Sequence, residues 1–243
     1  MKVERLNVGW FTAPAGLWRR GDDFERRVRF PVPAYLIETA GERILVDTGL
    51  HPSAAEDPGA HYGNGNALGM FTLEQERSIA EQVDLSDVSM VVLTHLHFDH
   101  AGGLSLLPPG VPVFVQRREW KAGQDEDAFA RSFLLPRDYE DACEQVRLVD
   151  GDHDLLGDES IRLLLTPGHT HGHQSVQVGE SLVIGADVVH YASGLDDKRF
   201  PVFGDDLDEQ GESADRLRAM REAGFTVLPG HDPDLLTPGP VAL

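Results

Sequence analysis

The chain has 243 residues, of which 41% are hydrophobic and 26% are charged, a composition typical of a globular protein. The N-terminal residues form no secretory signal, and no apolar run reaches the ~18 residues of a membrane span, so we expect a cytoplasmic protein with no membrane partner. The net charge of −20 argues against nucleic acid as a partner, because a phosphate backbone selects a basic surface.

The N-terminal part predicts strands separated by an aromatic loop. Residues 2–9 alternate weakly between apolar and polar and predict a first strand. Residues 10–30 are irregular and rich in aromatic side chains, which would either wall a substrate pocket or cap the core. Residues 33–39 and 43–47 then predict a hairpin that ends in Asp47.

The next stretch predicts a loop and a helix. Residues 51–71 are rich in Gly, Ala, Pro and Asn and predict a flexible loop. Thr72 and Gln75 have the spacing of a capping box, so we expect a helix to begin at Thr72 and to end near Asp84. A buried strand over residues 90–93 follows, and a helix followed by such a strand indicates an α/β protein.

A cluster of potential metal ligands follows that strand directly. His95, His97, Asp99 and His100 lie within six positions, and the glycines that come next suit a turn in which the backbone approaches a neighbour closely. In an extended segment His95 and His97 point to the same side and can share one cation. Imidazole and carboxylate ligands suit zinc and other divalent first-row metals.

The C-terminal half repeats the pattern of a strand that ends in a possible ligand. Strands are predicted at 111–115, 146–149, 161–166, 174–178, 182–186 and 225–229, with helices at 117–122 and 213–223 and a variable region at 123–145. Ser213 is the expected N-cap of the second helix. His169, Asp187 and His231 come directly after three of these strands, as His95 does after its own.

The segment HLHFDHAGG resembles the HxHxDH signature of the metallo-β-lactamase superfamily, and the PGHTHGHQS and GHD segments are similar to its N-acyl homoserine lactonase group. The resemblance extends over nearly the whole chain and implies one domain, residues 1–243, with an αββα sandwich fold. It also implies two divalent metal ions, zinc in the first place with iron, manganese or cobalt as alternatives. One ion would bind His95, His97 and His169; the other would bind Asp99, His100 and His231; Asp187 would bridge them.

The resemblance further implies hydrolysis of a lactone, most simply an N-acyl homoserine lactone used as a quorum signal, by a metal-bridging hydroxide. Asp99 would carry the proton to the leaving alkoxide. Asp47 and His173 would support the ligands by hydrogen bonds. The lactonase group has a tyrosine three residues after the bridging aspartate; here that residue is His190, with Tyr191 next, so either side chain would contact the substrate carbonyl.

The sequence leaves several alternative functions open. The site also suits another lactonase or carboxylester hydrolase, a glyoxalase-II-like thioesterase or, from a different class, a mononuclear iron persulfide dioxygenase. The partner we expect is a small lactone or ester, and the oligomeric state is open, with a homodimer as one arrangement. The apolar walls of the substrate pocket are predicted to come from four aromatic residues: Phe11, Trp18, Phe30 and Phe98.

Overall fold

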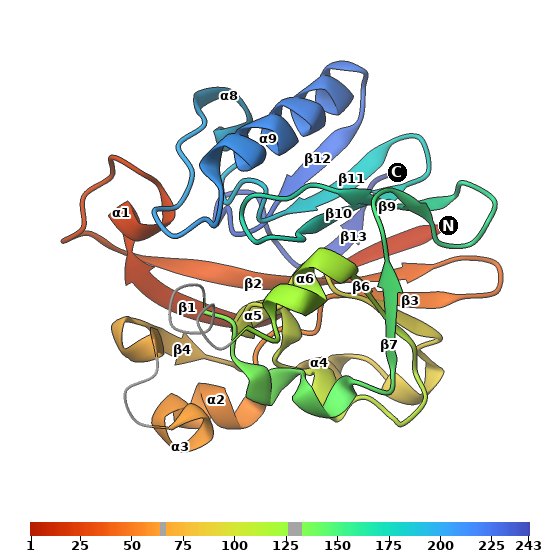
Figure 1. Ribbon diagram of the computed structural model, residues 1–243, viewed down its shortest axis with the longest axis horizontal. Helices are drawn as coiled ribbons and strands as arrows, with labels where there is room; N and C mark the ends of the chain where they lie inside the picture. The colour runs from red at the N-terminus through yellow and green to blue at the C-terminus, as the bar shows by residue number, and fades with distance from the viewer. Residues whose placement is uncertain (64–66, 126–132) are drawn as a thin grey trace.

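The computed structural model describes residues 1–63, 67–125 and 133–243 and places them in two sheets with helices outside both (Figure 1). Within this part of the chain, the larger sheet has eight strands in the order β13-β1-β2-β3-β5-β6-β7, with β4 paired to β1. Its strands are β1 (Lys2–Pro14), β2 (Arg27–Glu38), β3 (Arg43–Val46), β4 (Thr72–Glu74), β5 (Met90–Val92), β6 (Val113–Gln116), β7 (Val146–Val149) and β13 (Gly239–Val241).

The smaller sheet has five described strands in the order β12-β11-β10-β9-β8. They are β8 (His153–Asp154), β9 (Ile161–Leu165), β10 (Gln174–Val178), β11 (Leu182–Ala186) and β12 (Thr226–Pro229). Strand β12 joins β11 in parallel, whereas β10 runs antiparallel to both of its neighbours, β9 and β11. In the larger sheet, β3, β5, β6 and β7 are parallel neighbours.

Helices cover the outer face of each sheet (Figure 1). Helices α8 (Gly194–Asp197) and α9 (Leu207–Glu222) lie over the smaller sheet, and α2 (Pro52–Glu56), α3 (Pro58–Tyr62), α4 (Ile79–Gln82) and α5 (Phe98–Ala101) lie on the side of the larger sheet. The other helices in the described part of the chain are α1 (Ala15–Trp18), α6 (Arg117–Ala122) and the 3₁₀ turns Ala67–Met70, Leu85–Asp87, Leu104–Leu106, Pro136–Asp138 and Glu140–Ala142. None of the described helices has the length and apolar character of a membrane span.

Alternation along the strands explains the layers. Ile44 and Ile184 point between the two sheets and join one buried cluster, whereas their neighbours Leu45 and Val183 point outward into the helix-covered clusters. Successive side chains of a strand face opposite sides, so a strand that is apolar at every position is buried on both faces. The αββα sandwich expected from the sequence is therefore confirmed.

Two predicted helix starts were wrong. Thr72 begins strand β4, which pairs with Phe11 and its neighbours in β1, and the helix starts at Ile79, where the carboxylate of Glu81 accepts the Ser78 backbone N–H at 2.8 Å. Helix α9 begins at Leu207 rather than at Ser213, because the carboxylate of Asp206 caps it.

The expected loop over 51–71 contains α2 and α3, whose first turns are capped by the side chains of His51 and Asp57. The irregular stretch at 10–30 is also shorter than predicted, since β1 continues to Pro14 and β2 begins at Arg27. The variable region at 123–145 includes residues 126–132, which lie outside the described part of the chain.

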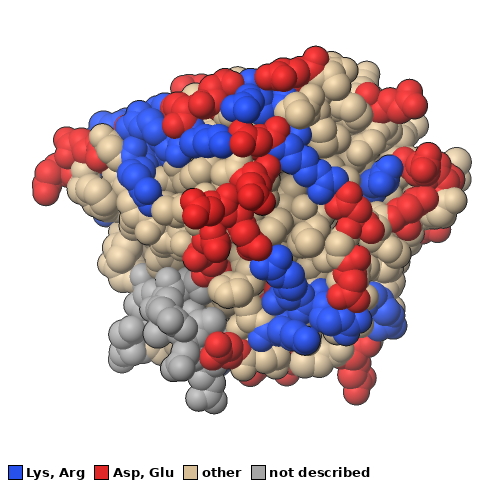
Figure 2. Space-filling view, turned by 45° about the horizontal axis from the view of Figure 1, so that its top comes forward, with Lys and Arg blue, Asp and Glu red and all other residues tan. Residues whose placement is uncertain are grey.

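Several basic side chains at the surface form ion pairs with carboxylates of the same chain. Figure 2 shows basic and acidic residues beside one another on the face in view. Arg118 pairs with Glu209 at 2.9 Å, and Arg216 pairs with Asp152 at 2.6 Å. Acidic residues remain in excess after such pairs have formed. The electrostatic potential of the surface is therefore negative overall.

Candidate metal centre

Strand β5 and helix α5 position the first four candidate ligands. His95 lies on the loop after β5, His97 is the N-cap residue of α5, and Asp99 and His100 lie in its single turn. The two glycines after the helix let this segment pack closely: a Cβ at Gly102 would lie 2.5 Å from the His51 backbone nitrogen. The close approach expected from the sequence fixes the turn against the chain that follows β3.

The smaller sheet supplies the other candidate ligands from the ends of three strands. His169 follows β9, Asp187 follows β11 and His231 follows β12. Ala186, just before Asp187, has φ +44°, a left-handed conformation that a side chain rarely adopts. Such strain costs about 1–3 kcal/mol and is concentrated at functional sites. The parallel pairing of β11 and β12 brings Asp187 and His231 to the same edge.

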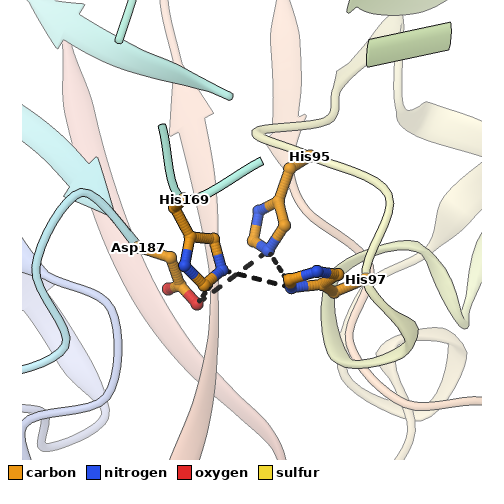
Figure 3. Close-up of side chains that lie close together, drawn as sticks. All are labelled: His95, His97, His169 and Asp187. Atoms are coloured by element: carbon orange, nitrogen blue, oxygen red, sulfur yellow. Dashed lines mark hydrogen bonds and ion pairs between the residues drawn. The ribbon is translucent and has the colours of Figure 1, made fainter. Parts of the chain in front are cut away.

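The first donor group consists of three histidines and Asp187 (Figure 3). Nδ1 of His97 lies 2.9 Å from Nε2 of His95 and 3.1 Å from Nε2 of His169. Oδ2 of Asp187 lies 3.3 Å from Nε2 of His169 and 3.9 Å from Nε2 of His95. All four side chains are buried, so these donors face one another away from solvent.

The second donor group consists of Asp99, His100 and His231, with Asp187 beside it. Nε2 of His231 lies 3.4 Å from Oδ2 of Asp99 and 3.2 Å from Oδ2 of Asp187. Nε2 of His100 lies 3.8 Å from Oδ2 of Asp99 and 3.7 Å from Oδ1 of Asp187. Asp187 therefore touches both groups, one oxygen toward His100 and the other toward the remaining histidines.

Hydrogen bonds on the far side of the imidazole rings orient their lone pairs into the site. Asp47 is an acceptor only, so the Thr94 hydroxyl donates to its Oδ2 at 2.8 Å and accepts from Nδ1 of His95 at 3.0 Å. Nδ1 of His100 donates to the same Asp47 oxygen at 2.8 Å. These bonds leave Nε2 of His95 without a proton, and they point the Nε2 atoms of His95 and His100 at the other candidate ligands.

Two more backbone-linked contacts hold the smaller-sheet ligands. His231 donates from Nδ1 to the Pro31 carbonyl at 2.8 Å, which leaves its Nε2 facing Asp187. Nε2 of His173 accepts the backbone N–H of Asp187 at 3.1 Å, while its Nδ1 faces Thr166. The structure thus places Asp47 and His173, both predicted from the sequence as supporting residues, in contact with candidate ligands.

The electrostatics of the cluster favour a cation. Burial lowers the pKa of His95 and of His97 well below the usual range, so both rings are neutral and able to ligate. Burial alone would also lower the pKa of His100, but the carboxylates of Asp47 and Asp187 outweigh it and raise that pKa well above its ordinary value. A positive charge at Nε2 of His100 is thus stabilised by its surroundings.

The donor geometry fits divalent metal ions. Ligand atoms around a tetrahedral zinc with bonds of 2.0–2.1 Å lie about 3.3–3.4 Å apart, close to the separations in the first group. Oδ2 of Asp99, Nε2 of His100 and Oδ1 of Asp187 are buried and make no hydrogen bond within the protein. Buried polar atoms without partners are rare, and a cation would satisfy all three.

His190 and Tyr191 occupy different surroundings. Nε2 of His190 lies 3.0 Å from Oδ2 of Asp187, and its Nδ1 lies 3.3 Å from the Trp18 carbonyl oxygen. Burial lowers the pKa of His190 to about 4, so the ring is neutral and has one N–H to donate. Tyr191 is half-buried, with the Arg19 guanidinium 5.6 Å from its ring. Of the two, His190 adjoins the donor cluster.

The predicted aromatic wall lies beside the histidines but is more deeply buried than expected. The ring centroid of Phe11 lies 5.1 Å from that of His231, and the ring of Trp18 lies 4.6 Å from that of His190. Phe30 packs on both, whereas Phe98 is in ring contact with Phe71 at 5.8 Å. All four predicted side chains are at most 3% exposed, so they also belong to the core.

One aromatic residue that sequence reasoning missed is Phe203. Its ring is half-buried and lies 5.0 Å from Trp18, 5.9 Å from His169 and 6.0 Å from His190. It lies in the segment between α8 and α9, for which no structure was predicted from the sequence. An aromatic residue flanked by loop residues after the bridging aspartate was the available signal.

Comparison with known proteins places this geometry in a family. The model of the metallo-beta-lactamase superfamily matches residues 27–231. An N-acyl homoserine lactonase of Bacillus thuringiensis is 30% identical over 84% of this chain and 82% of its own, and AttM, an N-acyl homoserine lactonase of Rhizobium radiobacter, is 29% identical over 88% of this chain and 85% of its own.

A solved N-acyl homoserine lactone hydrolase with the product N-hexanoyl-L-homoserine at its catalytic metal center superposes with a TM-score of 0.80. Its sequence is 26% identical, and the match covers 96% of this chain and 94% of that chain. The two donor groups joined by Asp187 lie within the part of the chain that the family model matches. This chain belongs to the metallo-beta-lactamase superfamily.

Proposed function

We propose that this protein is a metal-dependent lactonase that opens the ring of N-acyl homoserine lactones and thereby degrades quorum signals. The observation that carries the proposal is the pair of buried donor groups with Asp187 in contact with both. The substrate class is supported by the relatives, which are named N-acyl homoserine lactonases and are similar over more than four fifths of both chains.

The proposed metal content is two divalent ions, with zinc favoured by the nitrogen-rich donor set. His95, His97 and His169 would hold one, Asp99, His100 and His231 the other, and Asp187 both. When bound, two such ions lower the pKa of a water molecule and polarise the carbonyl oxygen of an ester. The protein contributes the fixed positions of the donors and the exclusion of bulk solvent.

Asp99 and His190 have distinct proposed roles. The Oδ2 atom of Asp99 is buried, makes no hydrogen bond and faces the cluster, so it is placed to hold a proton and to pass it to the ring oxygen as the carbon–oxygen bond breaks. His190 has a single N–H beside Asp187, and we assign it the contact with the substrate carbonyl rather than Tyr191.

We also propose that residues 1–243 act as one hydrolase domain in the cytoplasm. The support for one domain is that each donor group combines residues from the two sheets, so neither sheet holds a complete group. The support for the location is the presence of a single cysteine, Cys143, which is free and exposed and suits a reducing compartment.

The test is a pH-stat assay of the zinc-loaded protein on acyl homoserine lactones, γ-lactones, aryl esters and thioesters. We expect turnover of acyl homoserine lactones that is lost with a chelator and restored by zinc. Thioester cleavage without lactone turnover would overturn the proposal. Oxygen consumption by a protein that binds one iron would show that it catalyses a redox reaction rather than hydrolysis. For Asp99, the Asp99→Asn variant should retain folding and lose most turnover; near wild-type activity with both ions bound would exclude its role.

A further inference from the structure

A buried carboxylate outside the donor groups connects the two loops that hold the first of them. Glu119 lies in α6 and is fully buried, and none of the described cationic side chains forms an ion pair with it. Its Oε1 accepts the backbone N–H of Leu96 at 2.9 Å, and its Oε2 accepts the backbone N–H of Gly172 at 2.9 Å. Burying a carboxylate costs several kcal/mol, so its retention needs a reason.

The two donors to Glu119 belong to the loops that carry three of the candidate ligands. Leu96 lies between His95 and His97, and Gly172 lies three residues after His169. These loops come from different sheets, one after β5 and the other after β9. A single carboxylate with one oxygen on each loop therefore sets the separation of His95 and His97 from His169.

Close packing makes this connection rigid. A Cβ at Gly172 would lie 2.2 Å from the Glu119 backbone nitrogen, and a Cβ at Gly123, just after α6, would lie 2.6 Å from the Leu96 side chain. The helix backbone therefore sits directly on both loops. Neither loop can move away from Glu119 and keep this contact, and neither has room to move closer.

We propose that Glu119 is a positioning residue that aligns His95, His97 and His169 for one metal ion by holding both ligand loops through their backbone N–H groups. It does not touch the ion or the substrate. This role rests on the proposed function only in that the three histidines bind a metal. The second donor group, Asp99, His100 and His231, does not depend on it.

The informative substitution is Glu119→Gln, which keeps size and shape. A carboxamide has one acceptor oxygen, so its NH₂ group would face one of the two N–H donors and release that loop. Outer hydrogen-bond partners of metal ligands are typically worth 10–100-fold in metal affinity. We therefore expect the zinc affinity of the first group to fall by about that factor and the affinity of the second group to stay at the wild-type value.

The experiment measures zinc affinity by chelator competition in backgrounds that isolate each group. His231→Ala disables the second group and His97→Ala disables the first, and Glu119→Gln is added to each. Asp138→Asn is the matched control, because Asp138 is also a buried carboxylate but contacts Tyr62 rather than a ligand loop. Circular dichroism verifies that each variant is folded.

A fall in affinity in the His231→Ala background alone would establish the role. Equal losses in both backgrounds, or a loss matched by Asp138→Asn, would show a general effect of removing a buried charge and overturn it, as would unchanged affinity in both. A wild-type protein that binds zinc but turns over no lactone would contradict the proposed function and leave this result intact. One that binds no zinc would overturn both.

Discussion

The imidazole of His173 holds the backbone of the bridging aspartate: its Nε2 lies 3.1 Å from the Asp187 nitrogen and accepts that N–H. Burial lowers the pKa of His173 to about 3, so the ring stays neutral and keeps the lone pair that this bond requires. The contact acts on the residue that both donor groups share. The position of the Asp187 backbone therefore affects the geometry of both candidate metal sites.

The His173→Ala variant should lose zinc affinity by about 10–100-fold at both groups, because Asp187 is released from its fixed position. Zinc affinity measured by chelator competition checks this result. His153→Ala is the matched control, since His153 is exposed, lies in the edge strand β8 of the smaller sheet and belongs to neither donor group. Wild-type affinity in His173→Ala would show that the strand ends alone position Asp187.

His190→Ala should lower kcat/KM for an acyl homoserine lactone about 100-fold, the usual effect of removing one donor to a developing oxyanion. Tyr191→Phe should leave kcat/KM at the wild-type level, because its side chain lies away from the donor cluster. Steady-state kinetics on both variants, each loaded with zinc, provides the comparison. A fall in kcat/KM in Tyr191→Phe together with wild-type kcat/KM in His190→Ala would assign the substrate contact to Tyr191.

Phe203→Ala should raise KM for long-chain substrates by about 5–30-fold, which corresponds to the loss of 1–2 kcal/mol of apolar contact. The partly buried ring packs on the edge of the core close to Trp18 and His169, so it is placed to cover an acyl chain. The kcat and the KM for a short-chain lactone should not change. Phe24→Ala, at a ring that is 55% exposed, is the control. An equal rise in KM for short-chain and long-chain substrates would show that Phe203 does not recognise the acyl chain.

Asp138 should make the protein less stable as the pH rises. Burial raises the pKa of this carboxyl above its ordinary value of 3.8, so the native state holds its proton more tightly than the unfolded state does. The native state binds more protons between the two pKa values, and stability is therefore lost as the pH increases through that window.

Urea unfolding of the metal-free protein at several pH values measures this effect against Asp138→Asn. The stability of the wild type relative to the variant should be highest at acid pH, fall from about pH 4 upward and then level off. Because both proteins carry the same other titrating groups, their contributions cancel in the difference. A difference that rises with pH would mean that hydrogen bonds from Tyr62 favour the charged carboxylate more than burial disfavours it.

Most of the longer strands were predictable because apolar residues concentrate in them, but two helix boundaries were not. Helix α9 opens with a polar turn containing Asp208 and Glu209, which gives no apolar periodicity, and its cap is Asp206. Strand β4 is three residues long and is fixed by pairing with β1, far away in the sequence. A capping box at Thr72 is a local signal, and the distant pairing outweighed it.

The proximity of the candidate metal ligands to one another was predictable in part. The resemblance to the metallo-β-lactamase superfamily implied that seven side chains would meet, and the structure brings them into two groups. That they bind metal ions stays a prediction. Phe203 and Glu119 were not found, because their proximity to the histidines depends on how α6 and the segment before α9 pack on the sheets. No short-range pattern encodes such packing.

The layered fold has a mechanical consequence at the donor groups. The histidines on the loop after β5 and those on the strands of the smaller sheet have no covalent link other than the long main chain between them. An ion held by both layers would act as a cross-link, and its binding free energy would add to the free energy of unfolding. Chelation would then loosen the junction of the two sheets first, leaving each sheet's own hydrogen bonds intact.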